Sequence, residues 1–386
     1  MESKRMTLVQ QPIIQVINEL IKKNQGTISL GQGMVCYGPP KDALHSTLNE
    51  IDKLNISNYS AVHGINELRE GVVRKLLIEN NIDACKSSSY LAVTAGANMG
   101  FFNVLLAIAD IGDEVIILSP YYFNYEMAIR IVGAIPVVVQ TDNNWQPDIN
   151  EIKKHISPKT KAIVTISPNN PTGAVYSKSI LTEINLLCKE HNIYHISDEA
   201  YEYFVYNDAK HFSPASIPDS ENYTISLYSM SKCYGMAGWR IGFVLIPEVI
   251  SSAYCKIQDT DLICPTLISQ HLAVKALEVG ASYTVEHLKK LGDRRKLFCQ
   301  AFDKLRDKVD YVLPNGSIYF LLKIDSTLSS FDFVKNMIEK YRISAIPGVA
   351  FGVTSGCYIR VSYSALPDEM LEDAVKRLSA AIAECR

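Results

Sequence analysis

Lys232 is the residue of this sequence whose surroundings best suit covalent chemistry. It lies in the apolar, glycine-spaced stretch SLYSMSKCYGMAGWRIGF at 226–243, three residues after Ser229, one after Ser231 and eight before Arg240. A lone lysine in apolar sequence commonly extends its ammonium to solvent. An amine that is desolvated or close to another cation has a lowered pKa, however, and can act as a nucleophile or a base near neutral pH. The neighbouring hydroxyls and arginine therefore make Lys232 a candidate catalytic residue.

Further polar residues stand where other short apolar runs end. They are Gly96, Ala97 and Asn98 in TAGANMG, Tyr122 in SPYYFNY, Asn170 in SPNNPTG, and Asp198 with Tyr201 in SDEAYEYF. Each has an ordinary structural explanation when taken alone. PNNPTG makes a good turn before a helix, and Asp198 could cap the helix that follows it. A glycine-bearing turn before a helix is, by itself, weak evidence for phosphate binding.

One cofactor accounts for all of these residue types together. Pyridoxal phosphate needs a lysine for a Schiff base with its aldehyde, a carboxylate for its pyridine nitrogen, and N–H donors, hydroxyls and an arginine for its phosphate. The ends of the apolar runs supply each of these groups. Signatures of phosphate-binding P-loops, serine hydrolases and zinc proteases are missing from the sequence. We therefore expect pyridoxal 5'-phosphate as the cofactor and no metal site.

The elements that position these residues read as an α/β fold. Continuous apolar strands need both faces covered, so recurring β-branched runs predict a seven-stranded, mainly parallel sheet with helices on both faces. A helix is predicted at 177–192, between the fourth and fifth runs. Ligands of such sheets bind beyond the carboxyl ends of the strands, where the candidate residues stand. The runs are 91–94, 115–118, 136–139, 162–166, 193–197, 224–228 and 241–246.

The C-terminal third has a different pattern. A long helical pattern at 283–308 precedes YFLLKI, SFDFVKNMIEKY and CYIRVSYS, and a last helix is predicted at 371–386. We expect a smaller α+β domain here, joined by the N-terminal segment. The predicted division is a large cofactor-binding domain at 46–280 and a small domain made of 1–45 and 281–386.

Composition excludes several other classes of protein. The 386 residues are 47% hydrophobic and 20% charged, and 38 basic against 41 acidic residues give a net charge of -3, with no basic excess to suggest nucleic acid. Nine cysteines without a CxxC pair suggest reduced thiols. The N-terminus does not resemble a signal peptide, and acidic residues interrupt the most apolar region, 101–122. We expect a cytoplasmic protein without nucleic-acid or membrane partners.

Four motifs together resemble the class I/II aminotransferases of the fold-type I pyridoxal phosphate enzymes. They are SMSKCYGMAGWRIG, NPTG, SDEAY and, near the C-terminus, CYIRVSYS, and the resemblance extends from LGQG at 30–33 to RVSYS at 360–364. LGQG and ICPT at 263–266 are similar to the kynurenine and glutamine transaminase branch. This chain has MVCYGPP at 34–40, where that branch carries FPDFPPP. That departure leaves the substrate open.

The resemblance implies a role for each residue around the cofactor ring. Lys232 would hold the cofactor and move a proton between the substrate and the cofactor. Asp198 would pair with the ring nitrogen and keep it protonated, and Asn170 with Tyr201 would bind the phenolic oxygen. Tyr122 would stack on the ring face, in place of the tryptophan that many relatives carry.

The resemblance also implies how the phosphate and the substrate are held. The turn of Gly96, Ala97 and Asn98 would bind the phosphate, with Ser229 and Arg240 completing the cup. Arg360 in YIRVS would bind the substrate α-carboxylate with Asn170, and Gly33 would leave room for it. Tyr59, in YSAVHG, would reach the phosphate of a second copy, so a homodimer with shared sites is expected.

The implied activity is transfer of an amino group from an L-amino acid to a 2-oxo acid by a ping-pong mechanism. The candidates for the side-chain pocket are apolar or aromatic, namely Met34, Tyr37, Tyr122 and Ile318. We therefore expect methionine, aromatic or glutamine-like donors. A pyridoxal phosphate-dependent C–S lyase or an aminocyclopropane carboxylate synthase-like enzyme would share every motif. A non-catalytic pyridoxal phosphate-binding module is a further alternative.

Overall fold

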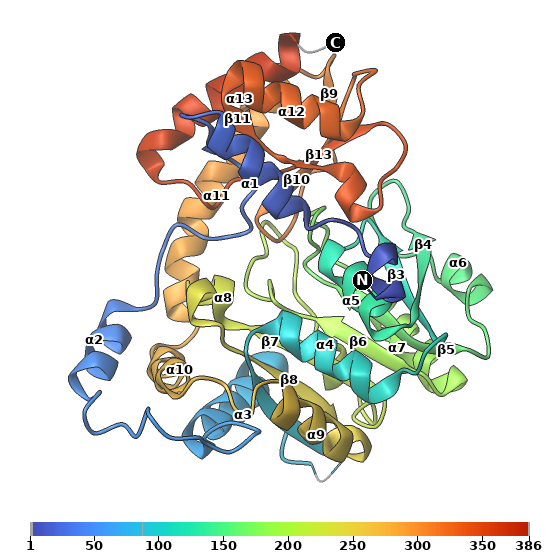
Figure 1. Ribbon diagram of the computed structural model, residues 1–386, viewed down its shortest axis with the longest axis vertical. Helices are drawn as coiled ribbons and strands as arrows, with labels where there is room; N and C mark the ends of the chain where they lie inside the picture. Colours follow the sequence, from blue (N-terminus) through green and yellow to red (C-terminus); the bar gives the residue numbers. More distant parts are fainter. Residues whose placement is uncertain (1–2, 87, 385–386) are drawn as a thin grey trace.

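A seven-stranded sheet forms the centre of the larger part of the molecule (Figure 1). The computed structural model describes residues 3–86 and 88–384. The strand order is β2-β8-β7-β6-β5-β3-β4, and only β8 runs antiparallel to its neighbours. The predicted α/β fold with a mainly parallel sheet is confirmed, and each predicted run lies in a strand to within one residue. The strands are β2 (Ser89–Thr94), β3 (Glu114–Ser119), β4 (Ile135–Gln140), β5 (Thr160–Ile166), β6 (Tyr194–Asp198), β7 (Thr224–Ser229) and β8 (Gly242–Pro247).

Helices cover both faces of this sheet because alternate strand residues point to opposite sides. In β3, Val115 and Ile117 join the core under α4, α5 and α9, whereas Ile116 and Leu118 join the core under α6 and α7. The helices α3 and α10 cover the same face as α7, at the β2 end of the sheet. The helices are α3 (Asn66–Asn80), α4 (Ala97–Ile108), α5 (Phe123–Val132), α6 (Ile149–Lys154), α7 (Lys178–His191), α9 (Ser251–Asp261) and α10 (Leu267–Val279).

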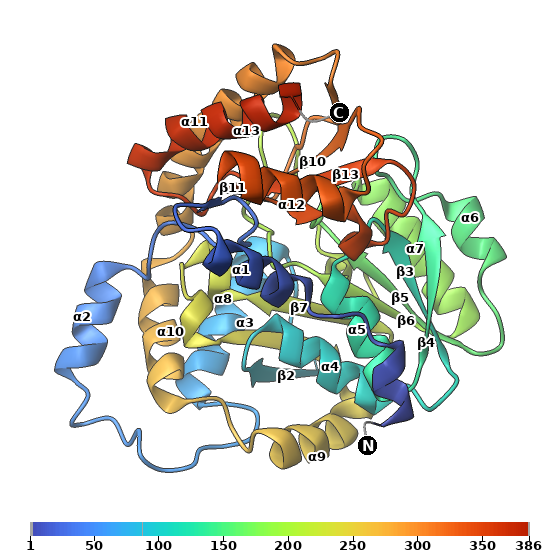
Figure 2. The same cartoon turned by 45° about the horizontal axis from the view of Figure 1, so that its top comes forward.

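The C-terminal third forms a second, antiparallel sheet of order β12-β13-β10-β9. The N-terminal segment joins it: α1 packs against α12, and β1 pairs with β11 (Figure 2). The predicted division at 45/46 falls within α2, and the division of the chain at 45/46 and 280/281 stays a prediction. The elements are α1 (Ile13–Lys23), β1 (Ile28–Ser29), α2 (Lys41–Asn49), α11 (Ser282–Asp303), β9 (Val309–Asp310), β10 (Tyr319–Ile324), α12 (Ser330–Tyr341), β11 (Ile343–Ser344), β12 (Ile346–Pro347), β13 (Cys357–Ser362) and α13 (Leu371–Glu384).

Helix ends follow local signals where the sequence supplies them. The predicted helix at 177–192 is α7, which Ser177 caps by accepting a hydrogen bond from the N–H of Ile180 at 3.2 Å. Asn192, with φ +53°, ends it. The helix predicted at 283–308 ends earlier, at Asp303, because the chain must turn before β9 can pair with β10.

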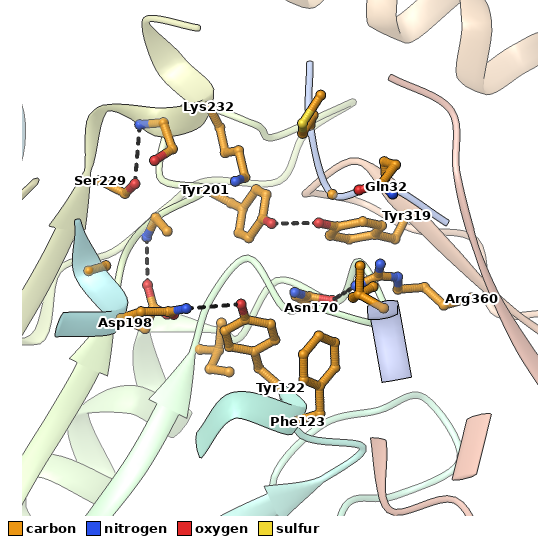
Figure 3. A pocket seen from close by; sticks show the side chains of 18 of the residues that line it. Gln32, Tyr122, Phe123, Asn170, Asp198, Tyr201, Ser229, Lys232, Tyr319 and Arg360 are labelled. Carbon is orange, nitrogen blue, oxygen red and sulfur yellow. Dashed lines mark hydrogen bonds between the residues drawn. The ribbon is translucent and has the colours of Figure 1, made fainter. Parts of the chain in front are cut away.

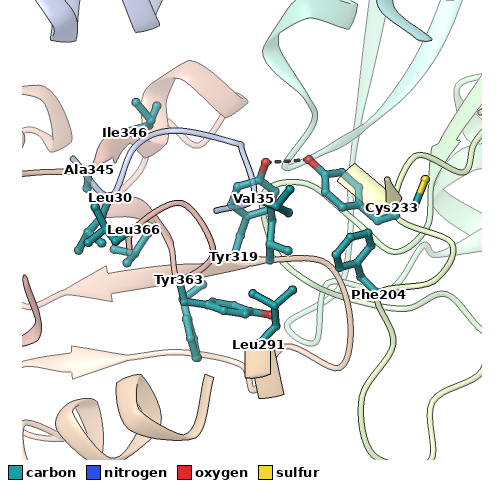
Figure 4. Close-up of a cluster of buried hydrophobic side chains, with 14 of the residues drawn as sticks. Leu30, Val35, Phe204, Cys233, Leu291, Tyr319, Ala345, Ile346, Tyr363 and Leu366 are labelled. Atoms are coloured by element: carbon teal, nitrogen blue, oxygen red, sulfur yellow. Dashed lines mark hydrogen bonds between the residues drawn. The ribbon is translucent and has the colours of Figure 1, made fainter. Parts of the chain in front are cut away.

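One hydrophobic core continues from the larger part into the C-terminal sheet (Figure 4). Leu30 and Val35 of the N-terminal segment pack in it with Phe204 and Cys233 from the larger part and Tyr363 from the smaller. The segment after β1 is therefore held by both parts of the molecule.

Two further expectations concern cysteines and membranes. Within residues 3–86 and 88–384 the cysteines form no disulfide, in line with reduced thiols, and Cys385 lies outside the described residues. In the same residues, every helix is too short or too polar to cross a lipid bilayer.

Candidate active site

A cavity of about 250 Å³ lies beyond the carboxyl ends of β5, β6 and β7, where the larger sheet meets the smaller one. Figure 3 shows Lys232 and Asp198 on one side of it and Arg360 on the other, with Tyr201 and Tyr319 between them. The lining residues are Ile14, Gln32, Gly33, Met34, Ala97, Asn98, Tyr122, Phe123, Ile166, Asn170, Asp198, Ala200, Tyr201, Ser229, Ser231, Lys232, Arg240, Tyr319 and Arg360.

Lys232 enters the cavity from α8 (Met230–Cys233), the short helix that follows β7. The Ser229 side chain caps this helix by accepting a hydrogen bond from the N–H of Ser231 at 3.2 Å. Burial, followed by the nearby Arg240 and Arg360, lowers the pKa of Lys232 to about 8, although Asp198 opposes the shift. Far more of this amine is therefore unprotonated near neutral pH than of an ordinary lysine, and the free amine can act as a nucleophile or a base.

Asp198 ends β6 as a buried carboxylate. The backbone N–H of Ala200 donates to one oxygen of this carboxylate at 2.8 Å. The hydroxyl of Tyr125 on α5 donates to the other oxygen. Burial raises the pKa of Asp198, whereas these two donors and the nearby Lys232 lower it. Sequence reasoning missed Tyr125; its only signal was membership of the aromatic cluster SPYYFNY.

Tyr201 and Asn170 occupy the middle of the cavity. The hydroxyls of Tyr201 and Tyr319 lie 2.7 Å apart, and burial raises the pKa of the Tyr201 phenol, which keeps its proton. Asn170 Oδ1 accepts a hydrogen bond from Arg360 Nη1 at 2.9 Å. This bond fixes the orientation of the amide group, and its NH2 can donate to a ligand.

An anion cradle opens at the N-terminus of α4. Gly96 precedes the helix with φ +85°, and a Cβ there would lie 2.5 Å from Arg240 Nη2. The first residues of α4, Ala97 and Asn98, line the cavity together with Ser229. A helix N-terminus, a hydroxyl and a guanidinium are the groups that bind phosphate in proteins.

Tyr122 forms one wall of the cavity. Its hydroxyl accepts hydrogen bonds from Asn124 at 2.8 Å and Asn98 at 3.4 Å, and burial raises the pKa of the phenol. The next residue, Phe123, extends the aromatic wall toward Phe351, with 5.7 Å between the ring centroids. A flat ligand therefore meets aromatic faces on this side.

Arg360 is a buried cation, 2% exposed, on β13. Its Nη2 donates to the carbonyl of Gly31 at 2.7 Å, and its guanidinium lies 4.3 Å above the ring of Tyr319. Within the described residues, no carboxylate forms an ion pair with it, and its Nε has no hydrogen-bond partner. A Cβ at Gly33 would lie 2.4 Å from the Tyr319 hydroxyl, so a side chain there would crowd this corner. A buried, unpaired guanidinium suits a carboxylate ligand.

Comparison with known proteins shows the family of this chain. The family profile of aminotransferase class I and II matches residues 25–378. The chain belongs to this family. It is 35% identical to an aspartate aminotransferase of Pyrococcus abyssi, over 99% of this chain and 98% of the relative. It is 34% identical to an aromatic-amino-acid aminotransferase of Thermococcus litoralis, with the same two coverages.

Solved structures agree with the fold of this aminotransferase. The aromatic aminotransferase of Pyrococcus horikoshii is 34% identical with a TM-score of 0.87, covering 95% of this chain and 99% of that one. The aspartate aminotransferase of Thermus thermophilus with maleate is 29% identical with a TM-score of 0.90, covering 99% of both chains. The kynurenine and glutamine transaminase likeness stays a prediction.

Class I aminotransferases of this fold use pyridoxal phosphate, and the residues of this chain fit it. The glycine at position 96 keeps the anion cradle open beside Arg240, and Asp198 places a buried carboxylate in the lining of the same cavity. When bound, the cofactor supplies an aldehyde that accepts amino groups and a ring that withdraws electrons.

Four sequence candidates are not among the residues that line the cavity of their own chain. Gly96 stands directly before the lining residue Ala97. Tyr59 is 80% exposed, so its expected contact with a partner's phosphate stays a prediction. The pocket assignments of Tyr37 and Ile318 were wrong: Tyr37 lies behind Lys232, and Ile318 is buried in the core. Tyr319 takes the place of Ile318 because neighbouring residues of an extended chain point to opposite faces.

The pairing of β10 with β13 explains how Tyr319 reaches the site. Leu321 pairs with Arg360, and Tyr319 lies two residues before Leu321, so Tyr319 and Arg360 share one face of the small sheet. The alternation in YFLLKI was the signal in the sequence, and its phase depended on the register with CYIRVSYS.

Proposed function

We propose that this aminotransferase moves the amino group of an aromatic, methionine or glutamine-like L-amino acid to a 2-oxo acid by a ping-pong mechanism. One observation carries the substrate class. Among the cavity-lining residues of the described chain, the basic side chains are Lys232, Arg240 and Arg360, and each has a proposed task other than binding a substrate side chain. A second carboxylate, as in aspartate, would meet the apolar or aromatic Ile14, Met34, Tyr122, Phe123 and Tyr319.

The cofactor-binding roles follow from the polar groups around the cavity. We assign the ring nitrogen to Asp198, whose carboxylate is already oriented by Tyr125 and the N–H of Ala200. A buried carboxylate with a raised pKa is a strong acceptor for a protonated ring nitrogen. Asn170 and Tyr201, which lie between Asp198 and Arg360, are assigned to the phenolic oxygen.

Phosphate and ring contacts complete the assignment. The cradle of Gly96, Ala97, Asn98, Ser229 and Arg240 is assigned to the phosphate, because it combines helix N–H groups with a hydroxyl and a guanidinium. Ser231, which also lines the cavity, extends this set of hydroxyls. Tyr122 is assigned to the ring face.

Lys232 is assigned the proton transfer. With the cofactor bound, its unprotonated amine would accept the proton from the substrate Cα and would donate it to the cofactor. Burial and the two arginines give the amine a pKa of about 8, close to the pH at which such a base must work. Its neighbours Cys233, Gly235 and Ala237 bring no second acid that could expel a leaving group, which favours transfer over elimination.

Arg360 is assigned the α-carboxylate of both substrates, with Gly33 leaving room beside it. A guanidinium fork binds a carboxylate through two parallel hydrogen bonds. Because donor and acceptor present the same carboxylate, one arginine serves both half-reactions, as ping-pong turnover requires. We further propose a homodimer in which Tyr59, exposed in the single chain, reaches the phosphate of the partner site.

A half-reaction experiment tests this function. The cofactor-loaded protein is mixed with phenylalanine, methionine, glutamine or aspartate, and the absorbance of the cofactor and the 2-oxo acid released are followed. We expect one equivalent of 2-oxo acid per site with the first three donors, then a halt until a 2-oxo acid acceptor is added. Sustained release of ammonia, thiol or a cyclised product without an acceptor would instead support the lyase or cyclase alternative. Preference for aspartate would refute the proposed substrate class, and absence of any conversion would support a non-catalytic role.

A further inference from the structure

The Tyr37 side chain reaches the backbone of Lys232 from outside the cavity. Its hydroxyl donates to the Lys232 carbonyl at 2.9 Å, and the N–H of Gly235 donates to the same carbonyl at 3.2 Å. The helix that carries Lys232, α8, has four residues. A helix this short gains little stability from its own hydrogen bonds, so contacts from outside decide where its backbone lies.

The ring of Tyr37 is itself fixed by α11. It stacks on His287 with 3.7 Å between centroids and 4° between planes, and it meets the edge of Tyr283 at 5.9 Å. Burial raises the pKa of the Tyr37 phenol, which therefore keeps its proton and stays a donor. Burial, reinforced by Lys290, lowers the pKa of His287, which favours a neutral ring in the stack.

The 31–38 segment, which contains Tyr37, is held at both of its own ends. At residues 31–38, the carbonyl of Gly31 accepts from Arg360 at 2.7 Å, and the carbonyl of Gly38 accepts from the Tyr283 hydroxyl at 2.6 Å. Gly235, with φ +61°, lies against this segment so closely that a Cβ would be 2.4 Å from the carbonyl oxygens of Tyr37 and Gly38. The turn after Lys232 and the 31–38 segment therefore fit together without free space.

We propose that Tyr37 is a positioning residue for Lys232: its hydroxyl fixes the backbone from which the reactive amine extends. The inference rests on the proposed role of Lys232. A displacement of about 1 Å at a reacting group can slow a reaction about a hundredfold, so a backbone contact of this kind acts on the rate.

Tyr37→Phe is the test, because it removes the hydroxyl and keeps the ring that stacks on His287. We expect kcat to fall about fivefold, the equivalent of one neutral hydrogen bond, with KM for the amino acid unchanged within about twofold. The kinetic isotope effect with Cα-deuterated amino acid should rise, since proton transfer becomes more strongly rate-limiting.

Tyr283→Phe is the matched control. It removes a hydroxyl from the same aromatic group. That hydroxyl also bonds the 31–38 segment, but it donates to the carbonyl of Gly38 and not to that of Lys232. Loss of general stability would affect both variants alike. A fall in kcat confined to Tyr37→Phe supports the inference, whereas equal effects in the two variants, or none in Tyr37→Phe, overturn it.

A second readout does not depend on turnover. In the cofactor-free protein, competitive acylation at a series of pH values reports the pKa and reactivity of the Lys232 amine. We expect Tyr37→Phe to raise this pKa by at least about 0.3 unit toward that of an ordinary lysine, as the amine leaves its buried position. A pKa equal to that of Tyr283→Phe would contradict the positioning role.

Failure of the proposed function is separable from failure of this inference. Borohydride reduction of the cofactor-loaded wild-type protein should attach the cofactor to the peptide that contains Lys232. Attachment to another lysine would refute the role of Lys232, and the inference with it. Attachment to Lys232, together with Tyr37→Phe behaving like the wild type, would refute only the role of Tyr37.

Discussion

Arg360 Nη1 donates to Asn170 Oδ1 across 2.9 Å, and this bond joins the C-terminal sheet to the turn after β5 of the central sheet. A second bond, from Nη2 to the carbonyl of Gly31, holds the other side of the guanidinium. The arginine is therefore oriented before any substrate arrives. A carboxylate that enters the cavity meets a fixed fork, so little conformational entropy is lost on binding.

Arg360→Lys should weaken the binding of amino acid and 2-oxo acid alike. Lysine keeps the charge, but its three N–H donors cannot bond Asn170, Gly31 and both oxygens of a carboxylate at once. The half-saturating concentrations of both substrates should rise about 10- to 100-fold, corresponding to about 1.5–3 kcal/mol. Steady-state kinetics measure both values. Arg306→Lys, at a half-exposed arginine that pairs with Asp303, is the control and should match the wild type. Unchanged half-saturation for either substrate would exclude the carboxylate role.

Asp198→Asn should keep the fold and still bind the cofactor, because the amide oxygen can accept from the N–H of Ala200 while the amide NH2 donates to the hydroxyl oxygen of Tyr125. Loss of the oriented charge should slow removal of the Cα proton at least about 100-fold. Single-turnover kinetics with a Cα-deuterated donor measure this step. Tyr125→Phe keeps the carboxylate and removes one donor, so its effect should be smaller. Near-normal proton removal in Asp198→Asn would mean that another group holds the ring nitrogen.

Gly96→Ala should weaken cofactor binding through the phosphate cradle. The new Cβ would lie 2.5 Å from Arg240 Nη2 and displace the guanidinium. The dissociation constants of pyridoxal phosphate and of inorganic phosphate should both rise at least about tenfold, which titration calorimetry can measure. Gly112→Ala is the control, because Gly112 has a similar φ of +88° but no atoms within 4 Å of its Cβ position. The Gly112→Ala variant therefore has the backbone strain of a positive φ without a steric clash. Equal phosphate affinity in the two variants would refute the cradle.

The lowered pKa of Lys232 should appear in the pH dependence of stability of the cofactor-free protein. Folded Lys232 loses its proton near pH 8, whereas the unfolded lysine keeps it to about pH 10.4. Between these values the unfolded state binds more protons, so this residue makes the free energy of unfolding increase with pH. Well below pH 8, the free energy of unfolding carries the whole penalty for burying the charged amine. This penalty decreases as the pH rises from about 8 to about 10.4.

Lys232→Met isolates this contribution from other titrating groups. Urea unfolding of both proteins at pH 7.5 and 9.5 should show the variant gaining less stability over this range than the wild type, by on the order of 1–2 kcal/mol. Parallel stability profiles would mean that Lys232 has an ordinary pKa in the folded protein.

Several site residues could be located from the sequence because they depend on local chain features. Asp198, Ser229 and Lys232 each follow a strand whose apolar run is visible in the sequence, and parallel strands bring their carboxyl ends to one edge. Gly96 stands where a strand turns into a helix with a positive φ, which glycine alone adopts readily. The order of these motifs was enough to predict the cofactor and the family.

Tyr125, Tyr319 and Tyr37 became recognisable only in the tertiary structure. Tyr125 donates to a carboxylate 73 residues away, and Tyr37 donates to a carbonyl 195 residues away. The position of Tyr319 depends on the register between β10 and β13. A shift of one residue in that register would place its side chain on the opposite face of the sheet from Arg360. Short-range patterns determined which segments become strands and helices and which reactive groups stand at their ends. The contacts that orient those groups join distant parts of the chain, and their geometry is set only when the two sheets pack together.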